Sequence, residues 1–215
     1  MTPLLRGLAL SGLLLLSACV AHQQPSAPPE VIARAAYAPP GPATVTLLTM
    51  INNRSGSGGH SALMIDGAQR VLFAPAGSWY HPQIPERGDV LYGMSPAFFD
   101  FYMDYHARET YHVVVQEIEV SAATALALTQ AVQSYGAVNQ SQCALSVSSV
   151  LGQVPGFEAV GRSWFPKRVM TGFAELPGVR TTRIYDDDSE DNLELLQAQA
   201  RQAQRAQEAA ERAAE

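Results

Sequence analysis

The sequence predicts an α+β domain with a mostly antiparallel sheet and helices packed on one face. Runs of β-branched and apolar residues, typical of strands, come mainly in the first half of the domain, and capped helical runs come mainly in the second. Strands and helices do not alternate regularly, as they do in parallel βαβ folds. The 215 residues are 47% hydrophobic and 16% charged, which fits one globular domain with short appendages.

The first residues of the chain predict export. Residues 1–18 read as a signal peptide, with Arg6 as the positive start and an apolar run too short to span a bilayer comfortably. Residues 16–19, LSAC, resemble a bacterial lipobox, which implies that Cys19 carries lipid and becomes the first mature residue. Val20 follows in place of an aspartate, which favours the outer membrane, facing the periplasm. The alternative is an ordinary cleaved signal peptide with a chance cysteine.

The two ends of the chain read as appendages to a domain at residues 44–185. Residues 19–43 are rich in Pro, Ala and Gln and predict a disordered tether. Residues 186–215 contain strong helix formers without a continuous apolar face, so we expect a solvated, charged helical tail. This tail holds nine acidic residues and three arginines, which accounts for the net charge of −6. The rest of the chain is neutral and shows no nucleic-acid-binding pattern.

Within the domain, the strands and helices can be assigned from periodicity, caps and turns. Gly-rich or Pro-rich turns separate the apolar runs, and Ser95 and Ser121 stand where N-caps are expected. Strands are predicted at 44–51, 60–66, 70–75, 90–94, 111–120 and 179–185, and helices at 97–109, 122–136 and 143–152. Residues 76–89 read as a long loop.

Cys143 is the candidate nucleophile. If Cys19 carries lipid, Cys143 has no intramolecular disulfide partner, and a lone thiol in an oxidising compartment must be buried or used. If Ser141 caps the helix, Cys143 falls in the first turn, where unpaired backbone N–H groups and the helix dipole favour a thiolate. Taken alone, a cysteine in a helix also fits a small core hydrophobe.

His60 is the candidate general base for this thiol. It begins a strand directly after the Gly-Ser turn at residues 55–59, and strand ends are where a rigid scaffold presents catalytic groups. The small residues before it would let the backbone of a substrate come close. Taken alone, a histidine at this position also fits a hydrogen-bonded surface residue.

Together, these segments resemble a known superfamily. GGHSALMI, then RVLFAPAGSW, then a late helix opening with Cys143 is similar to the circularly permuted branch of the NlpC-like, papain-fold cysteine hydrolases, over roughly residues 44–152. The resemblance implies a permuted papain-like core with Cys143 as nucleophile and His60 as base. The third, orienting polar residue of that family falls where this chain has Phe73 and Ala74, which is a departure. Asp66 or His81 remain as substitutes.

Aromatic, histidine and basic residues outside the Cys143–His60 pair are the other candidates for binding roles. Trp79 and Tyr80, in the Pro-rich loop, are candidates for the wall of a substrate cleft, whereas the aromatics of residues 97–105 have the spacing of core residues. His106 and His112 do not share a regular face and no second cysteine lies nearby, so no metal site is predicted. Residues 161–168, GRSWFPKR, form a basic aromatic segment that either binds an anionic group or packs as a return loop.

Two kinds of function follow from the sequence. The first is an envelope-anchored thiol hydrolase without a cofactor, acting on an amide, with peptidoglycan stem peptides as the natural substrate, or on an ester. The second is a catalytically weak or inactive envelope lipoprotein that binds peptidoglycan or another partner.

Overall fold

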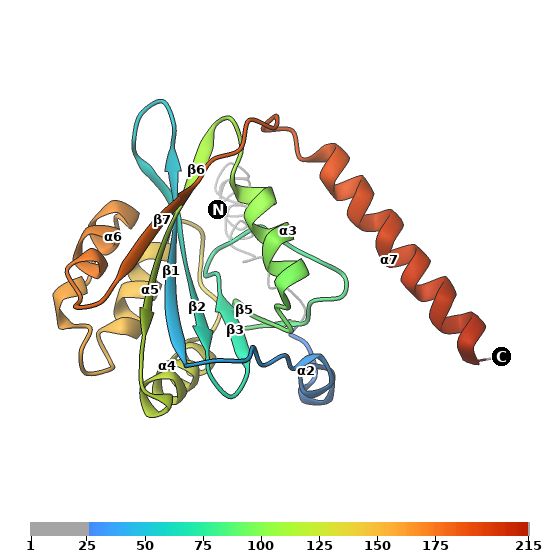
Figure 1. The fold of residues 1–215 in the computed structure, drawn as a ribbon, viewed down its shortest axis with the longest axis horizontal. Coiled ribbons are helices and arrows are strands. Elements are labelled where there is room, and N and C mark those ends of the chain that lie inside the picture. The colour runs from blue at the N-terminus through green and yellow to red at the C-terminus, as the bar shows by residue number, and fades with distance from the viewer. Residues whose placement is uncertain (1–25, 215) are drawn as a thin grey trace, which may run out of the picture.

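One antiparallel sheet organises the molecule. The computed structural model describes residues 26–214, and its sheet has seven strands in the order β4-β5-β3-β2-β1-β6-β7 (Figure 1). The strands are β1 (Thr44–Asn52), β2 (Gly58–Asp66), β3 (Arg70–Phe73), β4 (Glu86–Arg87), β5 (Val90–Tyr92), β6 (Tyr111–Glu119) and β7 (Arg180–Ile184). Neighbouring strands pair antiparallel throughout, so the predicted α+β class is confirmed.

The helices lie on both faces of this sheet. They are α2 (Pro29–Ala35), α3 (Pro96–His106), α4 (Ala122–Tyr135), α5 (Cys143–Leu151), α6 (Pro166–Ala174) and α7 (Leu193–Ala214), with a 3₁₀ turn η2 (Glu158–Val160). We predicted helices on one face only. Helices α4, α5 and α6 do cover one face, but α3 packs on the other (Figure 1).

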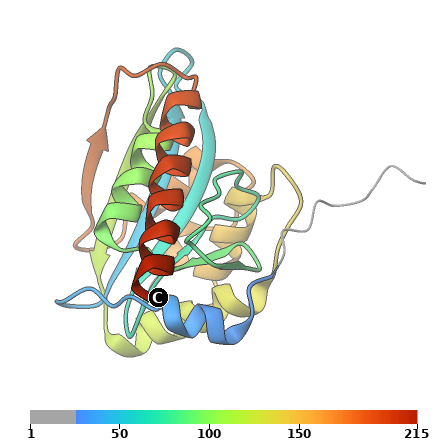
Figure 2. The same cartoon turned by 90° about the vertical axis from the view of Figure 1, so that its right-hand side faces the viewer.

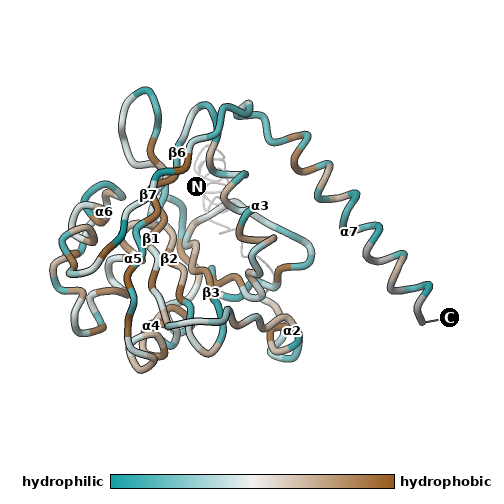
Figure 3. The backbone as a smooth tube through the Cα atoms, viewed as in Figure 1, coloured by the Kyte–Doolittle hydropathy of each residue, from teal (hydrophilic) through white to brown (hydrophobic). Residues whose placement is uncertain are grey.

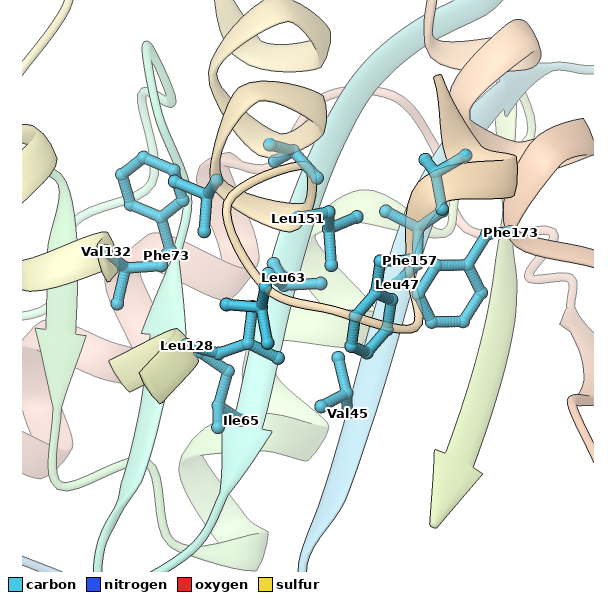
Figure 4. Close-up of a cluster of buried hydrophobic side chains, with 14 of the residues drawn as sticks. Val45, Leu47, Leu63, Ile65, Phe73, Leu128, Val132, Leu151, Phe157 and Phe173 are labelled. Atoms are coloured by element: carbon cyan, nitrogen blue, oxygen red, sulfur yellow. The ribbon is translucent and has the colours of Figure 1, made fainter. Parts of the chain in front are cut away.

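Each face of the sheet has its own core. Successive side chains of β2 point to opposite faces, so Leu63 and Ile65 join the core under α4, α5 and α6, whereas Ala62 and Met64 join the core under α3. Figure 4 shows the first core, where aliphatic side chains surround a few phenylalanine rings. The hydropathy colouring shows long apolar stretches along the central strands, β1 and β2 among them (Figure 3). Both cores are built from residues of the described part of the chain.

The hairpin between β1 and β2 fixes the start of β2. The Asn52 side chain accepts hydrogen bonds from the backbone N–H groups of Arg54 and Ser55, and Gly56 has a φ of 66°. Beyond this turn the pairing skips one residue, because Met50 pairs with His60 whereas Ile51 pairs with Gly58. This bulge is local to the residues just before His60.

Two predicted features near the helix ends had different outcomes. Ser121 caps α4 as expected, because its hydroxyl accepts a hydrogen bond from Thr124 N at 3.0 Å. The predicted Ser141 cap of α5 is wrong. Gln142 holds the N-cap position without a side-chain hydrogen bond, and Ser141 has a φ of 69°, which turns the chain just before Cys143.

The two ends of the described chain differ from each other. Residues 26–43 are not the disordered tether that we expected: they contain α2, and the backbone N–H groups of Ala27 and Arg70 bond to the carbonyls of Glu86 and Tyr37. The predicted helical tail is confirmed as α7, which leaves the body of the protein at its N-terminal end (Figures 1 and 2). The predicted signal peptide and Cys19 lie outside the described residues. Within residues 26–214, no helix is both long and apolar enough to cross a bilayer.

Candidate functional site

His60 faces the α3 side of the sheet. It pairs with Met50 and shares the parity of Ala62 and Met64, which belong to the core under α3. Its Nε2 has no hydrogen-bond partner and is closed off from solvent; a Cβ added at Gly77 would lie 3.7 Å from it. Burial lowers the pKa of His60 to about 4, so the imidazole is neutral at neutral pH.

A second histidine, His106, stacks on His60. The two rings are nearly parallel, with centroids 6.2 Å apart. His106 is the last residue of α3, and its Nδ1 donates to the carbonyl of Tyr102 at 2.7 Å, one helical turn earlier. That bond leaves Nε2 as the free lone pair of a neutral ring. Burial and, secondly, the charge of His60 lower the pKa of His106 to about 3, against the opposing effect of the Tyr102 carbonyl.

Tyr102 packs against His106 on the α3 side of the sheet. Its ring is fully buried, 4.2 Å from the ring of His106 and 5.4 Å from that of Trp79. Its hydroxyl has no hydrogen-bond partner among the described residues. Burial raises the pKa of Tyr102, and the charge of Cys143 raises it further.

Cys143 is the first residue of α5 and is buried and free of any disulfide. The first-turn placement expected from the sequence is therefore confirmed, although through a different N-cap. The loop before it is held by Asp89, whose carboxylate accepts from Val138 N at 3.0 Å and from Ala76 N at 3.1 Å. One carboxylate thus fixes both the loop that leads to Cys143 and the loop that leads to Gly77.

The short strand β3 leaves the first half of β2 without a strand neighbour on one side. Strand β3 ends at Phe73, opposite Leu63, so residues 58–62 of β2 have no strand neighbour on that side in the described structure. Cys143 begins a helix on one face of the sheet, and Tyr102 belongs to the helix on the other face. His60 Nε2 is unpartnered in residues 26–214, so it is not bonded to the Cys143 thiol in this conformation.

Neither substitute for the orienting residue contacts His60. Asp66 lies at the opposite end of β2, roughly 20 Å along the strand, where it forms an ion pair with Arg70 at 2.6 Å. His81 is buried against Phe98, with ring centroids 4.8 Å apart, and its Nδ1 accepts a hydrogen bond from Gln83 N. The Phe73 ring belongs to the core under α4 and α5, which confirms that this position offers no polar group.

The two predicted cleft residues have different environments. Trp79 is buried behind Tyr102, with its indole Nε1 unpartnered among the described residues. Tyr80 is 57% exposed, and its carbonyl accepts from Gln199 of α7 at 3.0 Å. Trp79 therefore packs against the ring of Tyr102 away from solvent, and Tyr80 lies at the surface.

A cavity of ≈ 340 Å³ opens onto the two stacked histidines. Besides His60 and His106, its lining includes Arg108 and, from the segment before α7, Glu190 and Asn192. That segment is attached by polar contacts, among them an ion pair of Asp188 with Arg108 at 3.0 Å and a hydrogen bond from Thr110 to Glu190. The C-terminal segment thus forms part of the wall of this cavity.

One acidic cluster lies beside this wall. Oxygen atoms of Asp104, Asp186 and Asp188 lie within 4.8 Å of one another, and Arg108 forms ion pairs with Asp104 at 3.1 Å and with Asp188 at 3.0 Å. The guanidinium group already balances part of the charge of this cluster. His112 contacts Asn53 and Tyr185 instead of His106.

Sequence patterns alone did not single out Tyr102 and His106 as residues of the candidate site. Their i, i+4 spacing at the end of a helix was visible, and it predicts side chains on one face. Helical aromatics are usually core residues, however, and only the packing of α3 over β2 shows that this pair meets His60. The chain matches no protein-family model, no curated protein and no solved structure.

Proposed function

We propose that the chain is a thiol hydrolase in which Cys143 is the nucleophile and a buried pair of neutral imidazoles, His60 and His106, accepts its proton. The observation that carries this proposal is the stacking of His60 and His106 in the wall of a cavity, with the unpartnered hydroxyl of Tyr102 beside the ring of His106. A buried donor without a partner costs about 1–3 kcal/mol. Such a cost is expected where a group is reserved for a ligand or a reacting atom.

The chemistry assigns one role to each group. The thiol proton passes to an imidazole nitrogen, and the sulfur attacks the carbonyl carbon of an amide or ester. The oxyanion accepts hydrogen bonds from Tyr102 Oη and from the backbone N–H of Cys143 at the start of α5. The imidazolium then protonates the leaving amine or alcohol, and water hydrolyses the thioester. A rearrangement that brings the Cys143 thiol to an imidazole nitrogen has to precede the first step, because His60 Nε2 is not hydrogen-bonded to it.

The cellular setting is part of the same proposal. The signal-like residues 1–18 and the LSAC sequence ending at Cys19 support an envelope lipoprotein of the outer membrane that faces the periplasm. In that compartment peptidoglycan stem peptides are the natural amide substrate. The order of a histidine strand before a cysteine helix supports membership of the permuted NlpC-like branch.

One observation favours a second function. No polar group orients His60, since Phe73 is apolar and both Asp66 and His81 contact other residues. An imidazole with a pKa near 4 is also a weak base. This arrangement favours a lapsed catalyst that binds a ligand, for example a peptidoglycan peptide, in the cavity lined by His60 and His106.

Burst kinetics with p-nitrophenyl acetate separate the two functions. The hydrolase gives about one equivalent of p-nitrophenol per chain in the first turnover, and then steady release. Cys143→Ala removes the burst, His60→Gln and His106→Gln slow it, and Tyr102→Phe lowers its rate without changing its amplitude. Ser149→Ala, on the same helix, is the matched control and leaves the burst unchanged. A parent chain without a burst, which still binds soluble stem peptides, would establish the binding function instead.

A further inference from the structure

The loop between η2 and α6, together with the first residues of α6 (residues 161–168), exposes two consecutive aromatic rings. Trp164 is 56% exposed and Phe165 is 62% exposed. Exposed apolar residues scattered singly over a surface are ordinary, whereas adjacent large rings mark an interaction site more often. We call residues 161–168 the aromatic loop.

Hydrogen bonds hold the aromatic loop in one shape. Ser163 N donates to Ser148 Oγ at 3.0 Å, Phe165 N donates to Ser163 Oγ at 3.0 Å, and Arg162 Nε donates to Ser149 Oγ at 3.1 Å. These bonds join groups of the loop to one another and to two serines of α5. The rings are therefore presented on a preorganised turn, which lowers the entropic cost of binding.

The aromatic loop is also braced against the sheet. Pro166 lies so close to Gly58 at the start of β2 that a Cβ added at Gly58 would come within 2.7 Å of Pro166 Cβ. A glycine is thus needed at position 58 for this approach. The loop rests on α5 through Ser148 and Ser149 and on β2 through Gly58, so its position is fixed relative to both elements.

The charge of this segment is opposite to that of the whole chain. The aromatic loop carries Arg162, Lys167 and Arg168, and no acidic residue occurs from 159 to 174, whereas the net charge of the chain is −6. The Arg168 guanidinium lies 5.6 Å from the centroid of the Phe165 ring. Cations therefore surround the two exposed rings, which complements a negatively charged partner.

We propose that the aromatic loop docks onto the surface of a membrane that contains anionic phospholipid. Trp164 and Phe165 enter the interfacial region, where aromatic rings are favoured, and the three cations pair with headgroups. A glycan or a nucleic acid fits less well, because such ligands stack on ring faces and the Arg168 guanidinium already lies over the Phe165 ring. The proposal is independent of the thiol chemistry of Cys143.

The two tryptophans of the chain supply the test, since Trp79 is buried and Trp164 is exposed. The chain from residue 20 onward, which contains both cores, is mixed with vesicles of 30% phosphatidylglycerol in phosphatidylcholine and with pure phosphatidylcholine vesicles. Anionic vesicles shift the tryptophan emission to the blue, and brominated lipid quenches it. Trp164→Phe removes both signals and still co-sediments. Phe165→Ser weakens co-sedimentation about tenfold, and Lys167→Gln weakens it about fivefold on anionic vesicles only.

Leu126→Ser, which removes a 54% exposed leucine of α4, is the matched control and leaves binding unchanged. Equal binding to neutral and anionic vesicles would overturn the proposal. So would an emission shift that survives in Trp164→Phe, or a Phe165→Ser variant that behaves like Leu126→Ser. Retention on isolated peptidoglycan sacculi without vesicle binding would assign the loop to a glycan instead.

Discussion

The two faces of the sheet bury different kinds of side chain. The core under α4, α5 and α6 is aliphatic with a few phenylalanines, and Tyr92 is its one ionisable member among the buried residues. The face under α3 buries the rings of His60, His81, Tyr102 and His106. One face therefore supplies stability that does not depend on pH, whereas the other holds neutral groups that resist protonation.

The largest expected effect is acid destabilisation from the α3 face. Burial depresses the pKa of His60 to about 4 and that of His106 to about 3, both below the unfolded value of 6.5. Between those values the unfolded chain binds protons that the folded chain does not, so stability is complete above pH 6.5 and falls as the pH drops. His60 alone contributes roughly 3 kcal/mol to this loss, and His106 slightly more.

Urea unfolding from pH 7.5 to pH 4 measures this loss. His60→Gln and His106→Gln should each flatten the profile. Glu86 acts in the opposite direction, since burial and, secondly, Asp89 raise its pKa to about 7, so its contribution is lost as the pH rises from 4.5 to about 7. Glu86→Gln should therefore steepen the net fall on acidification. A His60→Gln profile that matches the parent would show that His60 is not buried in solution.

The next effect belongs to the opposite face and should be independent of pH. Phe173 is fully buried in the core under α4, α5 and α6 (Figure 4). Phe173→Ala should destabilise the fold by about 3–5 kcal/mol, because it removes apolar burial and leaves a cavity. The loss should be the same at pH 7.5 and at pH 5. Leu126→Ala, at an exposed site of α4, should change stability by less than about 0.5 kcal/mol.

The smallest expected effect concerns the hydroxyl of Tyr102, in the core under α3. Tyr102→Phe removes a buried hydroxyl that has no partner in the described structure. The variant should therefore be as stable as the parent or more stable by about 1 kcal/mol, although the proposed chemistry slows. A thermal melt beside the burst assay measures both properties. A strong loss of stability would mean that the hydroxyl has a structural partner after all.

Much of the fold was predictable because local rules and tertiary packing agree. Apolar runs bounded by turn residues predicted β1 and β2, the Gly-rich turn between them was recognised, and Ser121 predicted the start of α4. Helices α2 and α6 were missed because each is short, seven and nine residues, and lies inside a segment rich in residues typical of turns and linkers. Helix α6 depends on tertiary contact: a Cβ at Gly172 would come within 2.6 Å of Val160 O.

The candidate site was predictable only in part, for a geometric reason. Cys143 at a helix start and His60 at a strand start follow from local patterns, and the structure confirms both positions. The face of the sheet on which each group acts depends on which helix covers which face, and no local pattern encodes this. The stacking of His106 on His60 and the contact of Tyr102 with His106 therefore emerge only from the packing of α3.

The early end of β3 leaves a gap in the hydrogen-bonded backbone of the sheet. A β-sheet normally insulates the chemistry of its two sides, because its hydrogen-bonded backbone is a continuous barrier. Here the barrier stops at Phe73, and residues 58–62 of β2, His60 among them, have no strand beside them on that side in the described structure. Lengthening β3 by two residues would extend the hydrogen-bonded ladder toward His60 and close this gap without changing the order of the strands.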